Sequence, residues 1–172
     1  MAKHLAEFGY KQVCCTPHCM RGVYEYSSAD VKKAVKSLQK NLNDMEVNLK
    51  VLPGMEYYLD DCFLLYLDDL LPLGDTRLVL VEAPPQAHPN VVEGCLAAIL
   101  SRGFKPLIAH PERSDFFINW GEEGFDAGRL GLVGEKPNFF KRIFGRKKEN
   151  SSSIIVHSTP SSENSPPDKC AG

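Results

Sequence analysis

Two histidines and two glutamates follow apolar segments at four separate places in the chain. His18 and Glu56 each come a few residues after such a segment, across a turn that contains proline, whereas Glu82 and His110 follow theirs directly. Imidazole and carboxylate together form a donor set that suits Mn, Fe or Zn. We therefore predict that His18, Glu56, Glu82 and His110 are ligands of a divalent metal.

Each of these residues also has a simpler explanation when it is taken alone. His18 can be an ordinary loop histidine, and Glu56 can be an exposed residue of a turn. Glu82 is harder to explain in this way, because it directly follows a strongly apolar segment and a buried carboxylate needs a partner or a metal. The same placement at four positions favours a shared metal site over four unrelated side chains.

Arg113 stands three residues after His110, in the segment His-Pro-Glu-Arg. A guanidinium group holds phosphate oxygens with two parallel hydrogen bonds. We predict that Arg113 binds the phosphate group of a substrate, and the alternative is an ion pair at the protein surface.

The elements that must position these residues alternate along the chain. Strands are predicted at 11–15, 49–52, 78–81 and 106–109, and helices at 2–8, 27–42, 59–71 and 91–100. In the second helix, Ser27 and Asp30 have the spacing of a capping box. Alternating strands and helices predict an α/β fold with a parallel sheet or a βα barrel. Functional residues of such barrels gather at the C-terminal ends of the strands, where the predicted ligands stand.

The composition is typical of a globular protein. The chain has 172 residues, of which 43% are hydrophobic and 24% charged, and its net charge is −2. This charge argues against a nucleic-acid partner. The apolar runs are too short for a transmembrane segment, and the first residues do not form a secretory signal. The six cysteines lack the spacing of a zinc site, so free thiols and a cytoplasmic location are expected.

The C-terminal part of the chain has a different character. Residues 138–148 combine aromatic and basic side chains, which predicts a short basic amphipathic segment with weak contact to a membrane surface as one alternative. Residues 149–172 are rich in Ser, Pro and Asn and are expected to be disordered. The apolar residues 154–156 are too few to anchor a fold. The expected organisation is a domain at 1–135, the amphipathic segment at 136–148 and a tail at 149–172.

Several motifs occur in an order that resembles a known superfamily. They are Thr-Pro-His at 16–18, Gly-Val-Tyr-Glu at 22–25, Leu-Pro-Gly-Met-Glu at 52–56, Val-Glu-Ala-Pro at 81–84 and Ala-His-Pro-Glu-Arg at 109–113. This set, over about 1–120, resembles the PHP (polymerase and histidinol phosphatase) superfamily. Within it, the set is most similar to the bacterial manganese-dependent tyrosine phosphatases of capsule and exopolysaccharide gene clusters.

The resemblance implies a distorted βα barrel that holds a cluster of divalent metal ions, with Mn²⁺ expected and Fe or Zn as alternatives. It implies that His18, Glu56, Glu82 and His110 are metal ligands, that Glu56 bridges two ions, and that Arg113 holds the phosphate. The implied activity is hydrolysis of phosphotyrosine on the tail of a bacterial tyrosine kinase. Two other functions remain open: hydrolysis of a small-molecule phosphate, and a catalytically incomplete remnant that acts as a binding protein.

The chain departs from the family pattern at both ends. The family opens with a strand that carries a His-x-His pair and closes with a strand that carries an Asp-x-His pair, and this sequence contains neither. We therefore expect a partial barrel that begins within its first helix and holds only part of the ligand set. The activity expected of such a site is low, because a multinuclear centre needs all its metals fixed in position.

Overall fold

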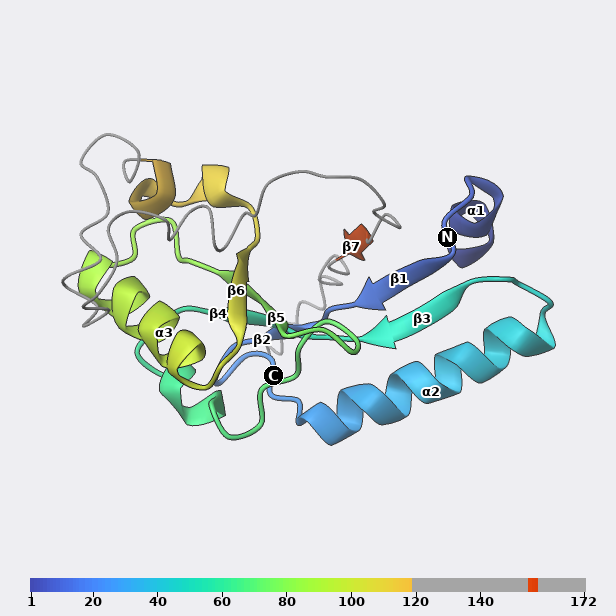
Figure 1. Cartoon of the computed structure of the whole chain (residues 1–172), viewed down its shortest axis with the longest axis horizontal. Helices are drawn as coiled ribbons and strands as arrows, with labels where there is room; N and C mark the ends of the chain where they lie inside the picture. Colours follow the sequence, from blue (N-terminus) through green and yellow to red (C-terminus); the bar gives the residue numbers. More distant parts are fainter. Residues whose placement is uncertain (119–154, 158–172) are drawn as a thin grey trace, which may run out of the picture.

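The computed structural model describes residues 1–118 and 155–157, and its strands form two small parallel sheets (Figure 1). One sheet has the order β3-β1-β7, with β1 at Gln12–Cys15, β3 at Lys50–Pro53 and β7 at Ile155–His157. The other has the order β2-β4-β5-β6, with β2 at His18–Cys19, β4 at Glu56–Tyr58, β5 at Leu78–Glu82 and β6 at Lys105–Ile108. Every strand pair is parallel. The predicted α/β fold with alternating parallel strands and helices is confirmed.

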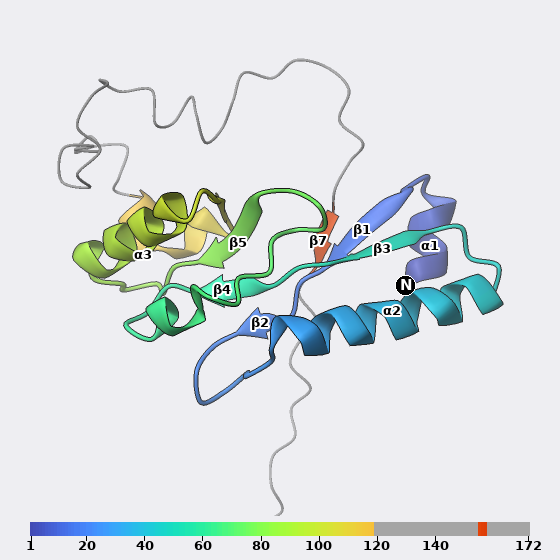
Figure 2. The same ribbon diagram turned by 60° about the horizontal axis from the view of Figure 1, so that its bottom comes forward.

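The two sheets are joined because the chain passes directly from one to the other twice, from β1 into β2 and from β3 into β4. The Gly54 N–H donates to the Cys15 carbonyl at 3.0 Å, and the Glu56 N–H donates to the Pro17 carbonyl at 3.0 Å. These bonds keep the two crossing segments side by side between the sheets (Figure 2). The sequence-predicted strands at 11–15 and 49–52 therefore each continue, after a short break, into a second strand that the sequence did not predict.

In the described part of the chain, the strands are accompanied by the α-helices α1 at Ala2–Glu7, α2 at Ser28–Asp44 and α3 at Pro89–Ser101. In Figure 1, α2 lies along β1 and β3, whereas α3 lies beside β6. The predicted capping box of α2 is confirmed, because the Asp30 N–H donates to Ser27 Oγ and the Ser27 N–H donates to Asp30 Oδ2, each at 3.1 Å. The helix turns Val31, Val35 and Leu42 into the core.

The core has two parts on opposite sides of the second sheet. The larger part includes Tyr57, Val79 and Val81, which are each at most 1% exposed, together with buried residues of α3. The smaller part consists of Cys14, Leu73 and Leu80 with partly buried neighbours that include Leu107 and Ala109. Strand residues two apart face the same side, so Leu80 and Glu82 point to the side of the smaller cluster.

The predicted helix at 59–71 is wrong, because this segment contains only the short 3₁₀ helix η1 at Phe63–Tyr66. The Cys62 N–H donates to the Asp60 carboxylate at 2.9 Å, and the Leu71 N–H donates to the Tyr57 hydroxyl at 2.8 Å. Side-chain acceptors of this kind compete with helical hydrogen bonds. The apolar spacing predicted the burial of Phe63 but not the backbone conformation.

Of the residues covered by the C-terminal predictions, the structure describes only 155–157. Ile155–His157 form β7 beside β1, which differs from the expected disorder at 149–172 and from the view that this apolar island does not join the fold. The amphipathic segment at 138–148 and the domain boundary at 135 lie outside the described residues and stay predictions. The five cysteines within the described part are free thiols: Cys14, Cys15, Cys19, Cys62 and Cys95. None of the helices in that part is both long and apolar enough to span a bilayer.

Candidate metal centre

Three of the four predicted ligands come together at the end of the second sheet. His18 and Glu56 are register partners on β2 and β4, and Glu82 is the last residue of β5. His18 Nε2 lies 3.5 Å from Glu82 Oε2 and 3.9 Å from Glu56 Oε1. One donor atom from each residue lies within 4.8 Å of the other two. The prediction that these side chains meet at one end of the sheet therefore matches the geometry for this group.

Strand register explains why the three side chains share one face. Glu56 pairs with Leu80, and Tyr58 pairs with Glu82. Paired residues of neighbouring parallel strands lie on the same face, as do residues two apart in one strand. The two carboxylates therefore project from the face that carries Leu80 and the smaller apolar cluster.

Gly54 sets the path of the chain into β4 just before Glu56. A Cβ atom at this position would lie 2.8 Å from Leu73 Cδ2 and 3.1 Å from Thr16 Cγ2. Close packing, and not the backbone conformation, requires glycine here, since the φ angle of Gly54 is outside the left-handed region. The absence of a side chain lets β3 continue into β4 directly against Thr16, which precedes β2 by two residues.

Glu56 has the unusual environment at this site. Its side chain is 2% exposed, and its Oε1 atom has no hydrogen-bond partner among the described residues. Burial raises the pKa of Glu56, the nearby Glu82 carboxylate raises it further, and the His18 imidazole opposes both effects. Burying a carboxylate without a hydrogen-bond partner costs free energy, and the His18 imidazole at 3.9 Å from Glu56 Oε1 offsets this cost only in part.

The donor set fits a divalent metal. An imidazole nitrogen and two carboxylates are ligands for Mn, Fe or Zn, and a cation would neutralise the two adjacent carboxylates and occupy the orphaned oxygen of Glu56. The observation that decides the fit is this buried oxygen, since a purely structural ion pair would leave no acceptor free.

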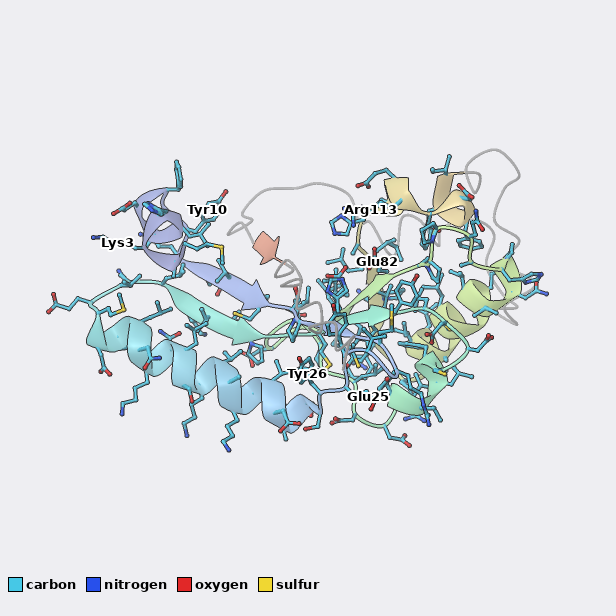
Figure 3. All side chains as sticks on the ribbon, turned by 180° about the vertical axis from the view of Figure 1, so that it is seen from behind. Lys3, Tyr10, Glu25, Tyr26, Glu82 and Arg113 are labelled. Carbon is cyan, nitrogen blue, oxygen red and sulfur yellow. The ribbon has the colours of Figure 1, made fainter. Side chains whose placement is uncertain are left out.

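Arg113 lies beside the three-residue group. It ends the 3₁₀ helix η2 at Pro111–Arg113, and its Nη1 atom is 3.9 Å from Glu82 Oε1. Its side chain is 62% exposed, so most of its donors face solvent. Figure 3 shows Glu82 and Arg113 on the same side of the sheet. A guanidinium in this position can take up a phosphate oxygen next to a metal held by Glu82.

His110 stands near the group but is not part of it. It follows β6 and has φ 45° and ψ 49°, a left-handed conformation that is uncommon for a residue other than glycine. Its Nδ1 atom lies 3.9 Å from Glu112 Oε1, and the side chain is 39% exposed. Its charge is close enough to lower the pKa of Glu56. Its role as a ligand stays a prediction, and the strained backbone is a feature that often occurs at functional sites.

Tyr24 is the residue that sequence reasoning missed. Its ring centroid lies 6.1 Å from that of His18, with an angle of 41° between the ring planes. The sequence offered Tyr24 only within the motif at 22–25, and nothing in its spacing indicated a contact with His18. The available signal was Gly22, which predicts a turn able to bring the next residues back toward β2.

Comparisons with known proteins agree on one family. A family model described as capsular polysaccharide synthesis, CpsB/CapC, matches residues 1–122. The tyrosine-protein phosphatase YwqE of Bacillus subtilis is 35% identical over 116 residues, which cover 66% of this chain and 46% of YwqE. CapC of Staphylococcus aureus is 24% identical over 108 residues, which cover 62% of this chain and 42% of CapC.

A solved structure is similar as well. This structure is one of a set of crystal structures of YwqE from Bacillus subtilis and CpsB from Streptococcus pneumoniae, which are described as unique metal-dependent tyrosine phosphatases. The match has a TM-score of 0.59 and 34% identity and covers 66% of this chain and 47% of the solved chain. The present chain thus spans about half the length of the relatives that it matches.

Proposed function

The chain belongs to the capsular polysaccharide synthesis CpsB/CapC family, and from this premise we propose that it is a metal-dependent phosphatase that acts on phosphotyrosine in proteins. The proposal includes Mn²⁺ as the metal and the tail of a bacterial tyrosine kinase, linked to capsule or exopolysaccharide synthesis, as the substrate. It places the protein in the cytoplasm.

The observation that carries this proposal is the buried Glu56 carboxylate, whose Oε1 has no hydrogen-bond partner among the described residues and which faces His18 and Glu82. An ion-pair network built for stability would satisfy that oxygen. A site built for a cation leaves the Glu56 oxygen available. Arg113 lies 3.9 Å from Glu82, close enough for one phosphate to contact both the guanidinium group and a metal held by Glu82.

The residues of the site divide the work of the proposed reaction. His18, Glu56 and Glu82 would hold the metal, with His110 as a further proposed ligand. Arg113 would bind the phosphate oxygens and orient the phosphorus. When bound, divalent metal supplies Lewis acidity toward the phosphoryl oxygens and lowers the pKa of water. The buried position of Glu56 excludes water from one side of the centre, which strengthens each electrostatic contact there.

The test compares the 172-residue chain with its Glu56→Gln variant. Mn²⁺ at 100 times its dissociation constant stabilises the folded chain by about 2.7 kcal/mol, which corresponds to a Tm increase of about 5–10 °C. We expect this increase, together with slow hydrolysis of a phosphotyrosine peptide, and the loss of both in Glu56→Gln. The matched control is Glu7→Gln on α1, which should keep both properties.

The possible results separate the candidate functions. No Mn²⁺-dependent change in Tm would overturn the metal centre. A Tm increase without turnover would overturn the phosphatase and favour the binding protein that the sequence left open. Turnover that survives Glu56→Gln would show that the reaction takes place at another site.

A further inference from the structure

Tyr24 is held in a fixed position next to His18 by its own loop. The Tyr24 N–H donates to the Met20 carbonyl at 2.8 Å, and the Met20 N–H donates to the Tyr24 carbonyl at 3.0 Å. These reciprocal bonds close a tight antiparallel turn directly after β2. The backbone of Tyr24 is therefore tied to the strand that carries His18.

The turn is also fastened on its other side. Gly22 has φ +76°, a left-handed conformation that glycine adopts without strain. The Gly22 N–H donates to Glu25 Oε1 at 3.0 Å. The residues on both sides of Tyr24 are thus engaged in contacts within the loop, which pre-organises the backbone that carries the ring.

The ring of Tyr24 lies next to one of the residues that would hold the metal, His18. His18 contacts both Glu82 and Tyr24, since its Nε2 atom is 3.5 Å from Glu82 Oε2 and its ring centroid is 6.1 Å from that of Tyr24. The ester group of a phosphate that Arg113 and a metal on His18 and Glu82 would hold can reach the neighbouring Tyr24 ring. The Tyr24 side chain is only half-buried, so part of its surface remains open to a ligand.

We propose that Tyr24 determines specificity by contacting the aromatic ring of an aryl phosphate, so that the site prefers aryl over alkyl phosphomonoesters. Aromatic rings attract one another at centroid distances of about 4.5–7 Å, beyond the effect of buried area. An alkyl phosphate such as phosphoserine offers no ring to this contact. The inference rests on the proposed function and adds the residue that selects phosphotyrosine.

The experiment measures binding rather than turnover. Phenyl phosphate and propyl phosphate are titrated separately into the full chain in the presence of Mn²⁺, and the ratio of the two dissociation constants is compared among variants. The aromatic contact predicts that phenyl phosphate binds about 3- to 10-fold more tightly. Tyr24→Leu should bring the ratio close to one, and Tyr24→Phe should preserve it.

The matched control is Tyr26→Leu. Tyr26 is a tyrosine two residues further along, is 48% exposed, and lies away from Glu82 and Arg113 in Figure 3. Its replacement should leave the ratio unchanged. Circular dichroism of each variant shows whether the fold is retained, and Tyr24→Phe provides a second test if Tyr24→Leu does not fold.

The outcomes distinguish this inference from the function on which it rests. If the chain prefers phenyl phosphate and Tyr24→Leu keeps that preference, Tyr24 does not select the ring, although the phosphatase proposal stands. If Tyr24→Leu weakens both ligands equally, Tyr24 only orients His18 and the inference is overturned. If the unaltered chain binds neither phosphate, the proposed function fails and the inference fails with it.

Discussion

At the scale of single residues, Glu56 has opposite effects on the stability of the metal-free fold and on the affinity of the site for a cation. Its carboxylate is almost completely buried and lies next to Glu82, with one oxygen that no described residue satisfies. A buried charge without full compensation destabilises the folded state. Functional sites often retain such groups at the expense of stability, and the same feature that makes Glu56 suitable for a cation makes it costly in the metal-free protein.

This conflict predicts that Glu56→Gln is more stable than the unaltered chain when metal is absent. Replacing the buried carboxylate with a neutral amide of the same shape should raise stability by about 1 kcal/mol, or about 2–4 °C in Tm. Thermal unfolding in the presence of a chelator measures the difference. With Mn²⁺ in excess, the order should reverse, because only the carboxylate gains stability from the cation. A lower Tm for the variant under both conditions would mean that Glu56 has a structural partner.

At the scale of elements, the start of α2 is attached to the loop after η1. The Ser28 N–H donates to Asp69 Oδ2 at 2.8 Å, and the Ser28 hydroxyl donates to Asp69 Oδ1 at 2.5 Å. These two hydrogen bonds lower the pKa of Asp69. A residue 41 positions away thus contributes to the N-terminus of α2, in addition to the local capping box.

We expect Asp69→Ala to destabilise the fold by about 1 kcal/mol near neutral pH, the usual effect of losing a helix cap. Because the folded pKa of Asp69 lies below its ordinary value of 3.8, this stabilisation is present above that value and is lost as the pH falls through the lower folded pKa. Urea unfolding at about pH 6 and at about pH 3 should therefore show a difference that shrinks in acid. Asp75→Ala, at an exposed position before β5, is the control and should show no such trend.

The turn between β3 and β4 depends on the small size of Gly54. A Cβ atom there would lie 2.8 Å from a methyl group of the buried Leu73, so Gly54→Ala should destabilise the protein by about 1–3 kcal/mol through overpacking. Gly94 lies within α3, and a Cβ atom there would meet nothing within 4 Å. Gly94→Ala should stabilise by about 0.5–1 kcal/mol through helix propensity. Two identical substitutions with opposite signs can be compared directly by thermal unfolding, and equal signs would contradict the packing explanation.

The sequence predicts the elements whose pattern is local. Ser27 and Asp30 predict the start of α2, because both partners of the capping box lie within one turn of the helix. Glu82 stands out because it ends an uninterrupted apolar strand. The strands β2 and β4 contain two and three residues, too few for an alternating pattern, and their pairing depends on neighbours that are distant in the sequence, such as Glu56 for His18 and Leu80 for Glu56. For the same reason, the sequence could place Tyr24 in a turn but not against His18.

At the scale of the whole molecule, the described residues form parallel strands, and each strand needs a neighbouring strand to pair with its backbone N–H and C=O groups. Parallel strands expose unpaired N–H and C=O groups at the sheet edge, and β1 avoids this exposure with β3 on one side and β7 on the other. The composition of the C-terminal region predicted no such role for 155–157, because an apolar run of three residues within a tail rich in Ser, Pro and Asn is too short to indicate a strand. Backbone pairing does not require a large apolar side chain, and so composition is a poor guide to it.

The pairing of β7 with β1 predicts that the C-terminal region is not uniformly dispensable. Two shortened chains are compared, one that ends at residue 157 and one that ends at residue 154. Because Val13, Cys14 and Cys15 are the register partners of β7, the shorter chain loses the hydrogen bonds on one edge of β1. At about 1 kcal/mol for the net loss of such bonds, its Tm should fall by about 2–4 °C relative to the longer one. Hydrogen exchange at the amides of β1 should accelerate in the shorter chain and stay unchanged in β5, which has neighbours on both sides. Equal Tm values and equal exchange in the two chains would show that β1 is stable with β3 alone.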